Sequence, residues 1–280
     1  MNKLCDLHTH SVFSDGTYTP TELVEAAEAM NLSAIALCDH NTVAGLPEFM
    51  AAAQGSTVEA VPGIEFSSDY MGKELHILGL FIQPQYYDAV SNLLDAALQR
   101  KEKSNVALIE ALKRAGYALD YGQIKAATPK GHVNRAHIAA ALTEKGYTPS
   151  VKAAFDTLLS PEAGFFQPPQ RISAFEIIDF IRSIHAVPVL AHPFLNLNQP
   201  ELEVFLEKAI PHGLAGMETL YPLFDEETTR TAKALADRFG LLQSGGSDFH
   251  GATKPDIRLG SGKGSLAVPM ELLHRLKNAK

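Results

Sequence analysis

The 280-residue sequence has only two cysteines and no tryptophan. Two cysteines, Cys5 and Cys38, are too few for a disulfide scaffold, which favours a reducing compartment. No apolar run approaches the roughly 18 residues of a membrane span, and the first residues reach a charge before any run of signal-peptide length. We therefore expect a cytoplasmic protein with no membrane partner.

Basic residues are also scarce, since 24 Lys and Arg face 32 Asp and Glu and the formal net charge is −8. Binding to a long nucleic acid depends on clustered Lys and Arg that release counterions, so a long nucleic-acid track is disfavoured. A small ligand suits this charge better. With 46% hydrophobic residues, the chain is long enough to bury a sizeable core.

Short apolar runs alternate with stretches of helical period, which is typical of a parallel α/β architecture. Thr19 and Glu22 form a predicted capping box, with Pro20 at the first helical position. A (β/α) barrel of about seven units fits better than an open sheet. The expected strands are 4–7, 34–38, part of 58–66, 75–81 (a hairpin across 71–73), 187–191, 214–220 and 241–244; the expected helices are 20–30, 43–53, 174–185, 201–209 and 226–239.

The alternation is interrupted in the middle of the chain. From about residue 86 to 159 the sequence predicts consecutive helices, with breaks near Gly116, Pro129-Lys130-Gly131 and Gly146. We therefore expect residues 1–99 and 171–280 to form the barrel, and residues 100–170 to form a helical insertion that covers the active site.

Histidine, with 11 residues, is placed mainly where the predicted strands end. His8 and His10 follow the first strand, and alternation along an extended chain puts both imidazoles on one side. The carboxyl ends of parallel strands share one face, so ligands at successive ends converge. Imidazole with carboxylate and no thiolate favours Mn, Zn or Fe. The candidate metal ligands, which are also the candidate catalytic residues, are His8, His10, Asp15, His40, Glu65, His76, His192, Asp248 and His250.

The motifs around these residues resemble, in order, those of the PHP (polymerase and histidinol phosphatase) family. This resemblance implies a distorted seven-stranded, TIM-like barrel and a phosphoesterase with two to three divalent metals, Mn first among them. The motifs are Asp6-Leu7-His8-Thr9-His10, Ser14-Asp15-Gly16, Cys38-Asp39-His40-Asn41, Gly63-Ile64-Glu65, His76-Ile77-Leu78-Gly79, Ala191-His192-Pro193 and Gly246-Ser247-Asp248-Phe249-His250.

The resemblance also implies how the ligands are shared. His8, His10, Glu65 and Asp248 would hold one metal; Glu65, His76 and His192 a second; and Asp15, His40 and His250 a third. Three divalent ions and three carboxylates leave three positive charges, which a phosphomonoester dianion and a hydroxide would neutralise. A phosphate ester therefore fits this site better than an uncharged amide.

A metal-bridged hydroxide would be the nucleophile, so neither serine nor cysteine is needed. Cys5 and Cys38 lie in apolar strands and are interpreted as core residues. His192 or His250 could protonate the leaving oxygen. Asp39 either orients a ligating imidazole or caps the helix that follows.

The predicted insertion contains the candidate substrate contacts. The segment 134–142 resembles one in the nucleotide-directed branch of the family, and Arg135 at a helix start suits a second phosphate, although a solvated arginine is the alternative. His137 is a further candidate. Arg171 is interpreted as a loop charge, and Phe165-Phe166 as core residues rather than a base-stacking pair.

One segment departs from that branch. After His192-Pro193 the branch commonly has glycine and a basic residue, whereas this chain has Phe194-Leu195-Asn196. We expect a metal-dependent phosphoesterase acting on a small phosphomonoester, such as a nucleoside 3′,5′-bisphosphate or the 5′ end of a short oligonucleotide. The alternatives are a histidinol-phosphate phosphatase, amide or deaminase chemistry on the same metals, and a non-catalytic or proofreading PHP module.

Overall fold

The computed structural model describes residues 3–128, 133–169 and 171–279. The chain divides into two compact units, one comprising residues 1–92 and 172–280 and the other residues 93–171. We call them the barrel unit and the helical unit. Among the described residues, no helix is long and apolar enough to cross a membrane.

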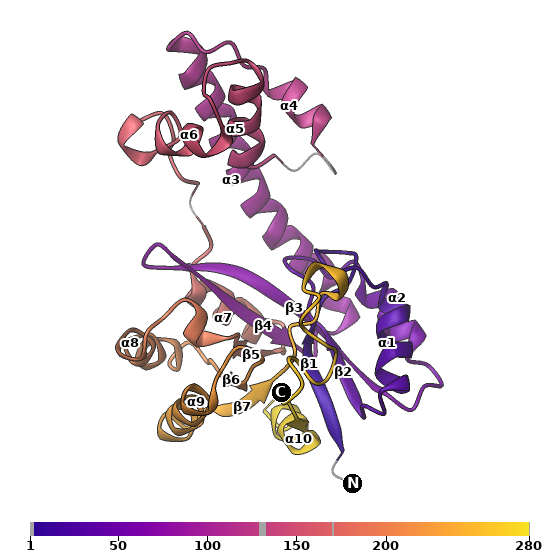
Figure 1. The fold of residues 1–280 in the computed structure, drawn as a ribbon. Coiled ribbons are helices and arrows are strands. Elements are labelled where there is room, and N and C mark those ends of the chain that lie inside the picture. The colour runs from indigo at the N-terminus through magenta and orange to yellow at the C-terminus, as the bar shows by residue number, and fades with distance from the viewer. Residues whose placement is uncertain (1–2, 129–132, 170, 280) are drawn as a thin grey trace. The chain divides into compact units, whose positions relative to one another are not determined.

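The barrel unit is a sheet with helices around its outside (Figure 1). The hydrogen-bonded strand order is β7-β6-β5-β4-β3-β2-β1-β8. Its strands are β1 (Leu4–Thr9), β2 (Ala34–Leu37), β3 (Glu59–Tyr70), β4 (Lys73–Leu80), β5 (Val187–Leu190), β6 (Gly216–Leu220), β7 (Leu242–Gly245) and β8 (Val268–Pro269), and its helices are α1 (Pro20–Ala29), α2 (Leu46–Ala52), α7 (Ala174–Ser183), α8 (Gln199–Ala209), α9 (Glu226–Arg238) and α10 (Met270–Lys277).

The sheet is a nearly closed barrel, as expected. The segment after β7 returns to β1, where the Asp248 amide donates to the His8 carbonyl at 2.8 Å and the His10 amide to the Phe249 carbonyl at 2.9 Å. Gly246 permits this approach, because a Cβ there would lie 2.4 Å from the His8 Cβ. The side chains of the β1 end and of the β7 loop are thereby brought together.

Two features of the sheet differ from a regular parallel barrel. β4 pairs antiparallel with β3, through the hairpin expected at 71–73, and also antiparallel with β5. β8, a two-residue strand that the sequence did not indicate, pairs antiparallel with β1 and is followed by α10. The predicted barrel of about seven strand-and-helix units is confirmed, and the additional strand, β8, has only two residues and therefore no detectable period.

The core and caps of the barrel unit follow the sequence. Thr19 and Glu22 form the capping box of α1, with Pro20 in its first turn. Cys5 and Cys38 are fully buried in the apolar cluster inside the barrel, and burial raises the pKa of both thiols. The interpretation of both as core residues is confirmed.

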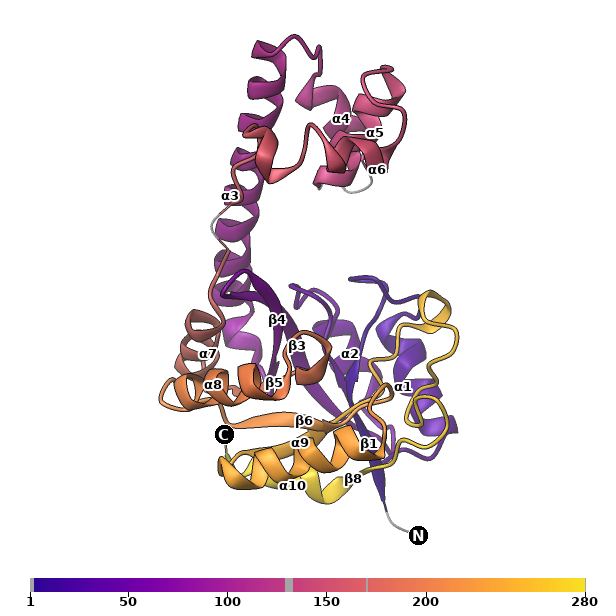
Figure 2. The ribbon, with the colours of Figure 1, turned by 60° about the vertical axis from the view of Figure 1, so that its left-hand side comes forward.

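The helical unit has a separate apolar core. The 28-residue α3 (Tyr87–Arg114) begins in the barrel unit, and the boundary at 92–93 lies within it. Gly116 and Gly146 end helices in the left-handed region, with φ of 96° and 75°. The break expected at 129–131 lies outside the described residues. The other helices are α4 (Tyr121–Ala127), α5 (Arg135–Glu144) and α6 (Val151–Asp156) (Figure 2).

Candidate metal centre

The barrel unit brings the nine candidate ligands together, most of them in the segments that follow its strands, while Glu65 lies within β3 and His76 lies within the antiparallel β4. β1 and the loop after it carry His8, His10 and Asp15, and His40 follows β2. β3 carries Glu65 and β4 carries His76. The remaining ligands come from the segments after β5 and β7, and they are His192, Asp248 and His250.

Glu65 lies at the centre of this cluster and is fully buried. Its Oε1 is 2.8 Å from His76 Nδ1 and 3.0 Å from His192 Nε2. Its Oε2 is 2.9 Å from His40 Nδ1, 3.3 Å from His8 Nε2 and 3.4 Å from His10 Nε2. The two oxygens face different imidazoles, which is the arrangement that a bridging carboxylate requires.

Asp15 and Asp248 stand on opposite sides of His10. Asp248 Oδ1 is 3.1 Å from His10 Nε2, and Asp15 Oδ1 is 3.9 Å from His10 Nδ1. Asp15 Oδ1 is also 3.2 Å from His250 Nε2, and its Oδ2 is 3.8 Å from His40 Nε2. His10 is therefore shared by two groups of ligand-type atoms.

The donor set fits divalent metals. Within each of three groups the ligand-type atoms lie within 4.8 Å of one another: His10-Asp15-His40-His250, His8-His10-Glu65 and His40-Glu65-His76. Buried polar atoms without a hydrogen-bond partner are costly, so they indicate a missing shared partner. Among the described residues, such atoms include His8 Nε2, both ring nitrogens of His10, His40 Nδ1, Glu65 Oε2 and His250 Nε2.

Burial and the charges of neighbouring residues shift the pKa values of several side chains in the cluster. Burial opposes ionisation of Glu65, yet the neighbouring imidazoles, His8 foremost, hold its pKa well below the usual value. Burial lowers the pKa of His10 to about 3. His76 is also buried, but the Glu65 and Glu74 carboxylates outweigh burial and raise its pKa to about 9. In the absence of cations, protons on some imidazoles balance the carboxylates.

Glu218, on β6, is a further carboxylate beside the cluster that the sequence motifs did not indicate. It is fully buried; its Oε1 accepts from His8 Nδ1 at 3.0 Å, and its Oε2 accepts from the His192 amide at 2.7 Å. A carboxylate behind an imidazole fixes the tautomer that ligates a metal. The available signal was the triplet Gly216-Met217-Glu218, which repeats the pattern of Gly63-Ile64-Glu65.

Asp6 and Tyr221 also support the cluster from behind. Asp6, fully buried on β1, accepts from the amides of Ser247 at 2.8 Å, Gly260 at 2.7 Å and His8 at 3.3 Å. The Tyr221 hydroxyl donates to Asp248 Oδ2 at 2.8 Å, and burial raises its pKa, so it stays a donor. These contacts fix the two chain segments that carry His8 and Asp248.

Asp39 has neither of the roles considered for it. Its carboxylate accepts from the Ser11 amide at 2.7 Å, the Ser11 hydroxyl at 2.6 Å and the Ser14 hydroxyl at 2.6 Å. Among the residues that the structure describes, Asp39 accepts from no imidazole, and α2 has Gly45 as its N-cap, with no side-chain cap bond. Asp39 instead shapes the loop that leads from His10 to Asp15.

Two of the clustered residues have unusual backbones. His192 has φ of 28° and Asp248 has φ of 54°, in the region that favours glycine. Each such residue costs of order 1–3 kcal/mol and persists where the surroundings impose it. The Glu218 bond to the His192 amide and the Asp248 amide bond to β1 are the contacts that impose it here.

Arg135 and His137 lie in the helical unit. Arg135 begins α5, and its guanidinium lies 4.3 Å from the Phe166 ring centre and 5.6 Å from that of Phe155. His137 completes the capping box of α5 with Asn134. Phe165 and Phe166 pack against the apolar core of this unit, as expected. The roles of Arg135 and His137 toward substrate stay predictions.

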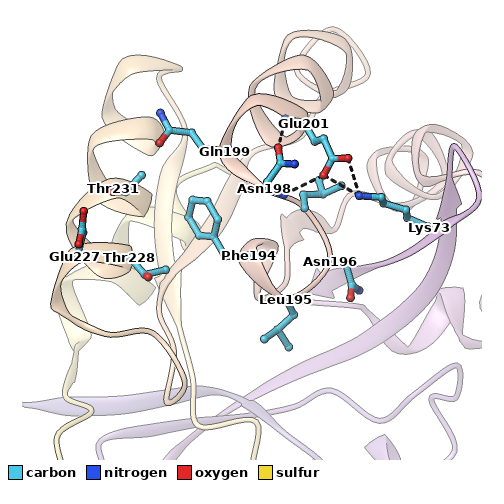
Figure 3. A pocket seen from close by; sticks show the side chains of 11 residues that line it. Lys73, Phe194, Leu195, Asn196, Asn198, Gln199, Glu201, Glu227, Thr228 and Thr231 are labelled. Carbon is cyan, nitrogen blue, oxygen red and sulfur yellow. Dashed lines mark hydrogen bonds and ion pairs between the residues drawn. The ribbon is translucent and has the colours of Figure 1, made fainter.

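The segment after His192 lines a pocket of about 640 Å³ in the barrel unit. Phe194, Asn196 and Asn198 border it with Lys73, whose ammonium pairs with both Glu201 oxygens at 2.7 Å (Figure 3). The lysine charge in this pocket is therefore already neutralised by a carboxylate.

Residues 6–163 match the model of the PHP domain family. The chain belongs to the PHP family. It is 32% identical over 251 residues to a 5′-3′ exoribonuclease of Haemophilus influenzae, covering 89% of this chain and 91% of that protein. It is 29% identical over 247 residues to a 3′,5′-nucleoside bisphosphate phosphatase of Chromobacterium violaceum, covering 88% and 86%.

One solved structure is similar in fold over nearly the whole chain. A protein from Bifidobacterium adolescentis described as a metal-dependent phosphoesterase is 26% identical, has a TM-score of 0.70, and covers 99% of this chain and 96% of its own. These matches confirm the barrel and the family that the motifs indicated. This PHP protein is a metal-dependent phosphoesterase.

Proposed function

We propose that this PHP protein hydrolyses a terminal phosphate from a nucleotide, either a nucleoside 3′,5′-bisphosphate or the 5′ end of a short oligonucleotide. The observation that carries the proposal is the cluster of nine ligand-type side chains around Glu65, six of which are buried. The two named relatives act on nucleic-acid-derived substrates according to their names, which supports the nucleotide class.

We propose Mn as the metal, with Zn or Fe as alternatives, because the donors are imidazoles and carboxylates without thiolate. Each bound divalent ion lowers the pKa of a coordinated water toward ~7 and polarises phosphoryl oxygens. His8, His10, Glu65 and Asp248 would hold one ion. The other two sets would be Glu65 with His76 and His192, and Asp15 with His40 and His250.

Side chains behind the cluster orient the candidate metal ligands. Glu218 accepts from Nδ1 of His8, so that His8 Nε2 faces Glu65 and Asp248 and, once deprotonated, could ligate an ion held between them. Tyr221 holds one oxygen of Asp248, so that its other oxygen faces His10. The backbones of His192 and Asp248 are held at strand ends. Such preorganisation lowers the reorganisation cost of the reaction.

The decisive experiment is a phosphate-release assay on the Mn-loaded full chain. The panel contains nucleoside 3′,5′-bisphosphates, nucleoside monophosphates, 5′-phosphorylated oligonucleotides of about three residues and histidinol phosphate. We expect kcat/KM for the bisphosphates or the oligonucleotides to exceed that for histidinol phosphate by at least ~100-fold. Preferential hydrolysis of histidinol phosphate would contradict the nucleotide proposal, and no release from any phosphomonoester would contradict the phosphatase.

A further inference from the structure

A lysine in the segment after His250 reaches the metal centre. Lys254 Nζ lies 2.7 Å from Asp248 Oδ2, the oxygen that also accepts from Tyr221. The other Asp248 oxygen faces His10 Nε2 at 3.1 Å. The Lys254 ammonium therefore contacts one of the candidate ligands, Asp248, directly.

The position of Lys254 is fixed by its segment. Gly251 has φ of 65°, and a Cβ there would lie 2.1 Å from Thr17 Oγ1, so the chain packs directly on the loop that follows Asp15. The Ala252 amide donates to Thr17 Oγ1 at 2.9 Å, and the Thr253 hydroxyl donates to the Asp15 carbonyl at 2.9 Å. The backbone that carries Lys254 is thus tied to the loop that carries a candidate ligand.

The side chain itself remains accessible. The Lys254 side chain is 40% exposed, whereas that of Asp248 is 6% exposed. A lysine has a flexible stem and three donors, so its ammonium can turn from a carboxylate toward a bound anion at little cost. When cations neutralise Asp248, the attraction of that carboxylate for the ammonium falls.

On the basis of the proposed function, we propose that Lys254 binds an oxygen of the phosphate that is released. The segment after His192 contains no basic residue, and Lys73 beside it is paired with Glu201. Lys254 is also paired with a carboxylate, but that carboxylate, Asp248, is a candidate metal ligand, and the Lys254 side chain is 40% exposed. It gives the site a preference for a terminal phosphate dianion.

The test uses the full chain loaded with Mn and inorganic phosphate as the probe. Lys254→Gln removes the charge, Lys254→Arg retains it, and Lys263→Gln is the matched control because Lys263 is an exposed lysine of the same segment between β7 and β8. Phosphate affinity is measured by calorimetry, and bound Mn per chain by elemental analysis. A charge-assisted contact predicts an affinity loss of about 10-fold or more in Lys254→Gln.

We expect the phosphate affinity of Lys254→Arg to remain within ~3-fold of wild type and that of Lys263→Gln to be unchanged. Bound Mn per chain should be the same in all three variants as in wild type. Unchanged phosphate affinity in Lys254→Gln would overturn the proposal. A parallel fall in bound Mn would also overturn it, because the lysine would then act only through Asp248. If Lys254→Gln loses phosphate affinity but the wild-type chain hydrolyses no nucleotide, the role of Lys254 is supported and the proposed function is contradicted. If the wild-type chain hydrolyses nucleotides but Lys254→Gln keeps its phosphate affinity, the proposed function is supported and the role of Lys254 is contradicted.

Discussion

Glu218 Oε1 lies 3.0 Å from His8 Nδ1, and both side chains are fully buried. The second Glu218 oxygen accepts from the His192 amide at 2.7 Å. The Glu218 carboxylate thereby holds the His8 side chain on β1 and the His192 backbone after β5. Burial would lower the pKa of His8, but Glu218, Glu65 and Asp248 raise it well above its usual value.

Glu218→Gln should weaken metal binding without removing a ligand. The amide has the shape of the carboxylate but lacks its charge, so the His8 imidazole becomes a poorer and less well oriented donor. Loss of such a partner typically costs 10–100-fold in metal affinity or activity. Competition with a chelator measures the affinity. Glu226→Gln, at an exposed position of α9, is the control, and equal affinities in the two variants would contradict the positioning role.

Asp248→Asn should abolish turnover and reduce metal-dependent stabilisation. A metal that binds only the folded chain adds about 4 kcal/mol at 1,000 times its Kd, which raises Tm by several degrees. We expect wild type to show this rise with added Mn and Asp248→Asn to show much less. Asp256→Asn, an exposed change in the same segment, should behave as wild type. A full Mn-dependent Tm rise in Asp248→Asn would exclude Asp248 as a ligand.

Metal binding should release protons at pH 7.5. The pKa of His76 is raised to about 9, so this imidazole is protonated at pH 7.5 in the absence of metal, and the neighbouring carboxylates raise the pKa of His8 as well. An imidazole must lose its proton to ligate, so metal affinity should rise with pH until about pH 9. Calorimetry in buffers of different ionisation enthalpy measures the released protons. Zero release at pH 7.5 would contradict these shifts.

The metal-free chain has the corresponding stability dependence. Because the folded pKa of His76 lies above its unfolded value, its contribution is present below about pH 6.5 and is lost as pH rises through about 9. Asp15, whose pKa is lowered to about 2 by His250 despite burial, contributes above its unfolded pKa and loses that contribution as pH falls toward 2. Denaturant unfolding at several pH values in the presence of a chelator tests both directions.

The cluster was predictable because its residues have local signals. His8 and His10 alternate at one strand end, and several further ligands, such as His40 and His192, follow an apolar run, so the carboxyl ends of parallel strands place them together. For Glu218 and Asp6 the signal is weaker, because a triplet or a motif does not show that their carboxylates contact segments distant in sequence. Their roles depend on which strands are neighbours, and strand order is not a local property.

The supporting network should matter for stability more than for chemistry. Asp6 accepts hydrogen bonds from the buried amides of Ser247, Gly260 and His8. Asp6→Ala leaves these donors unpaired, and each unsatisfied buried group costs about 1–3 kcal/mol. We expect a loss of at least ~3 kcal/mol in the free energy of unfolding, measured with denaturant. Asp69→Ala, at a half-buried position of β3, is the control. If Asp6→Ala and Asp69→Ala lose the same free energy of unfolding, the hydrogen bonds to Asp6 do not stabilise the fold.

Arg135→Ala should discriminate between substrates with one and two phosphates. A planar guanidinium at the start of α5 suits a second phosphate, and its stacking on Phe166 restricts its motion. We expect KM to rise about 10-fold or more for a nucleoside 3′,5′-bisphosphate, and to stay within ~2-fold for the monophosphate. Arg135→Lys retains the charge without the bidentate geometry and should be intermediate. Because Arg135 also packs on aromatic rings, Tm is measured for each variant; equal KM changes for both substrates would show that Arg135 acts through folding of the helical unit.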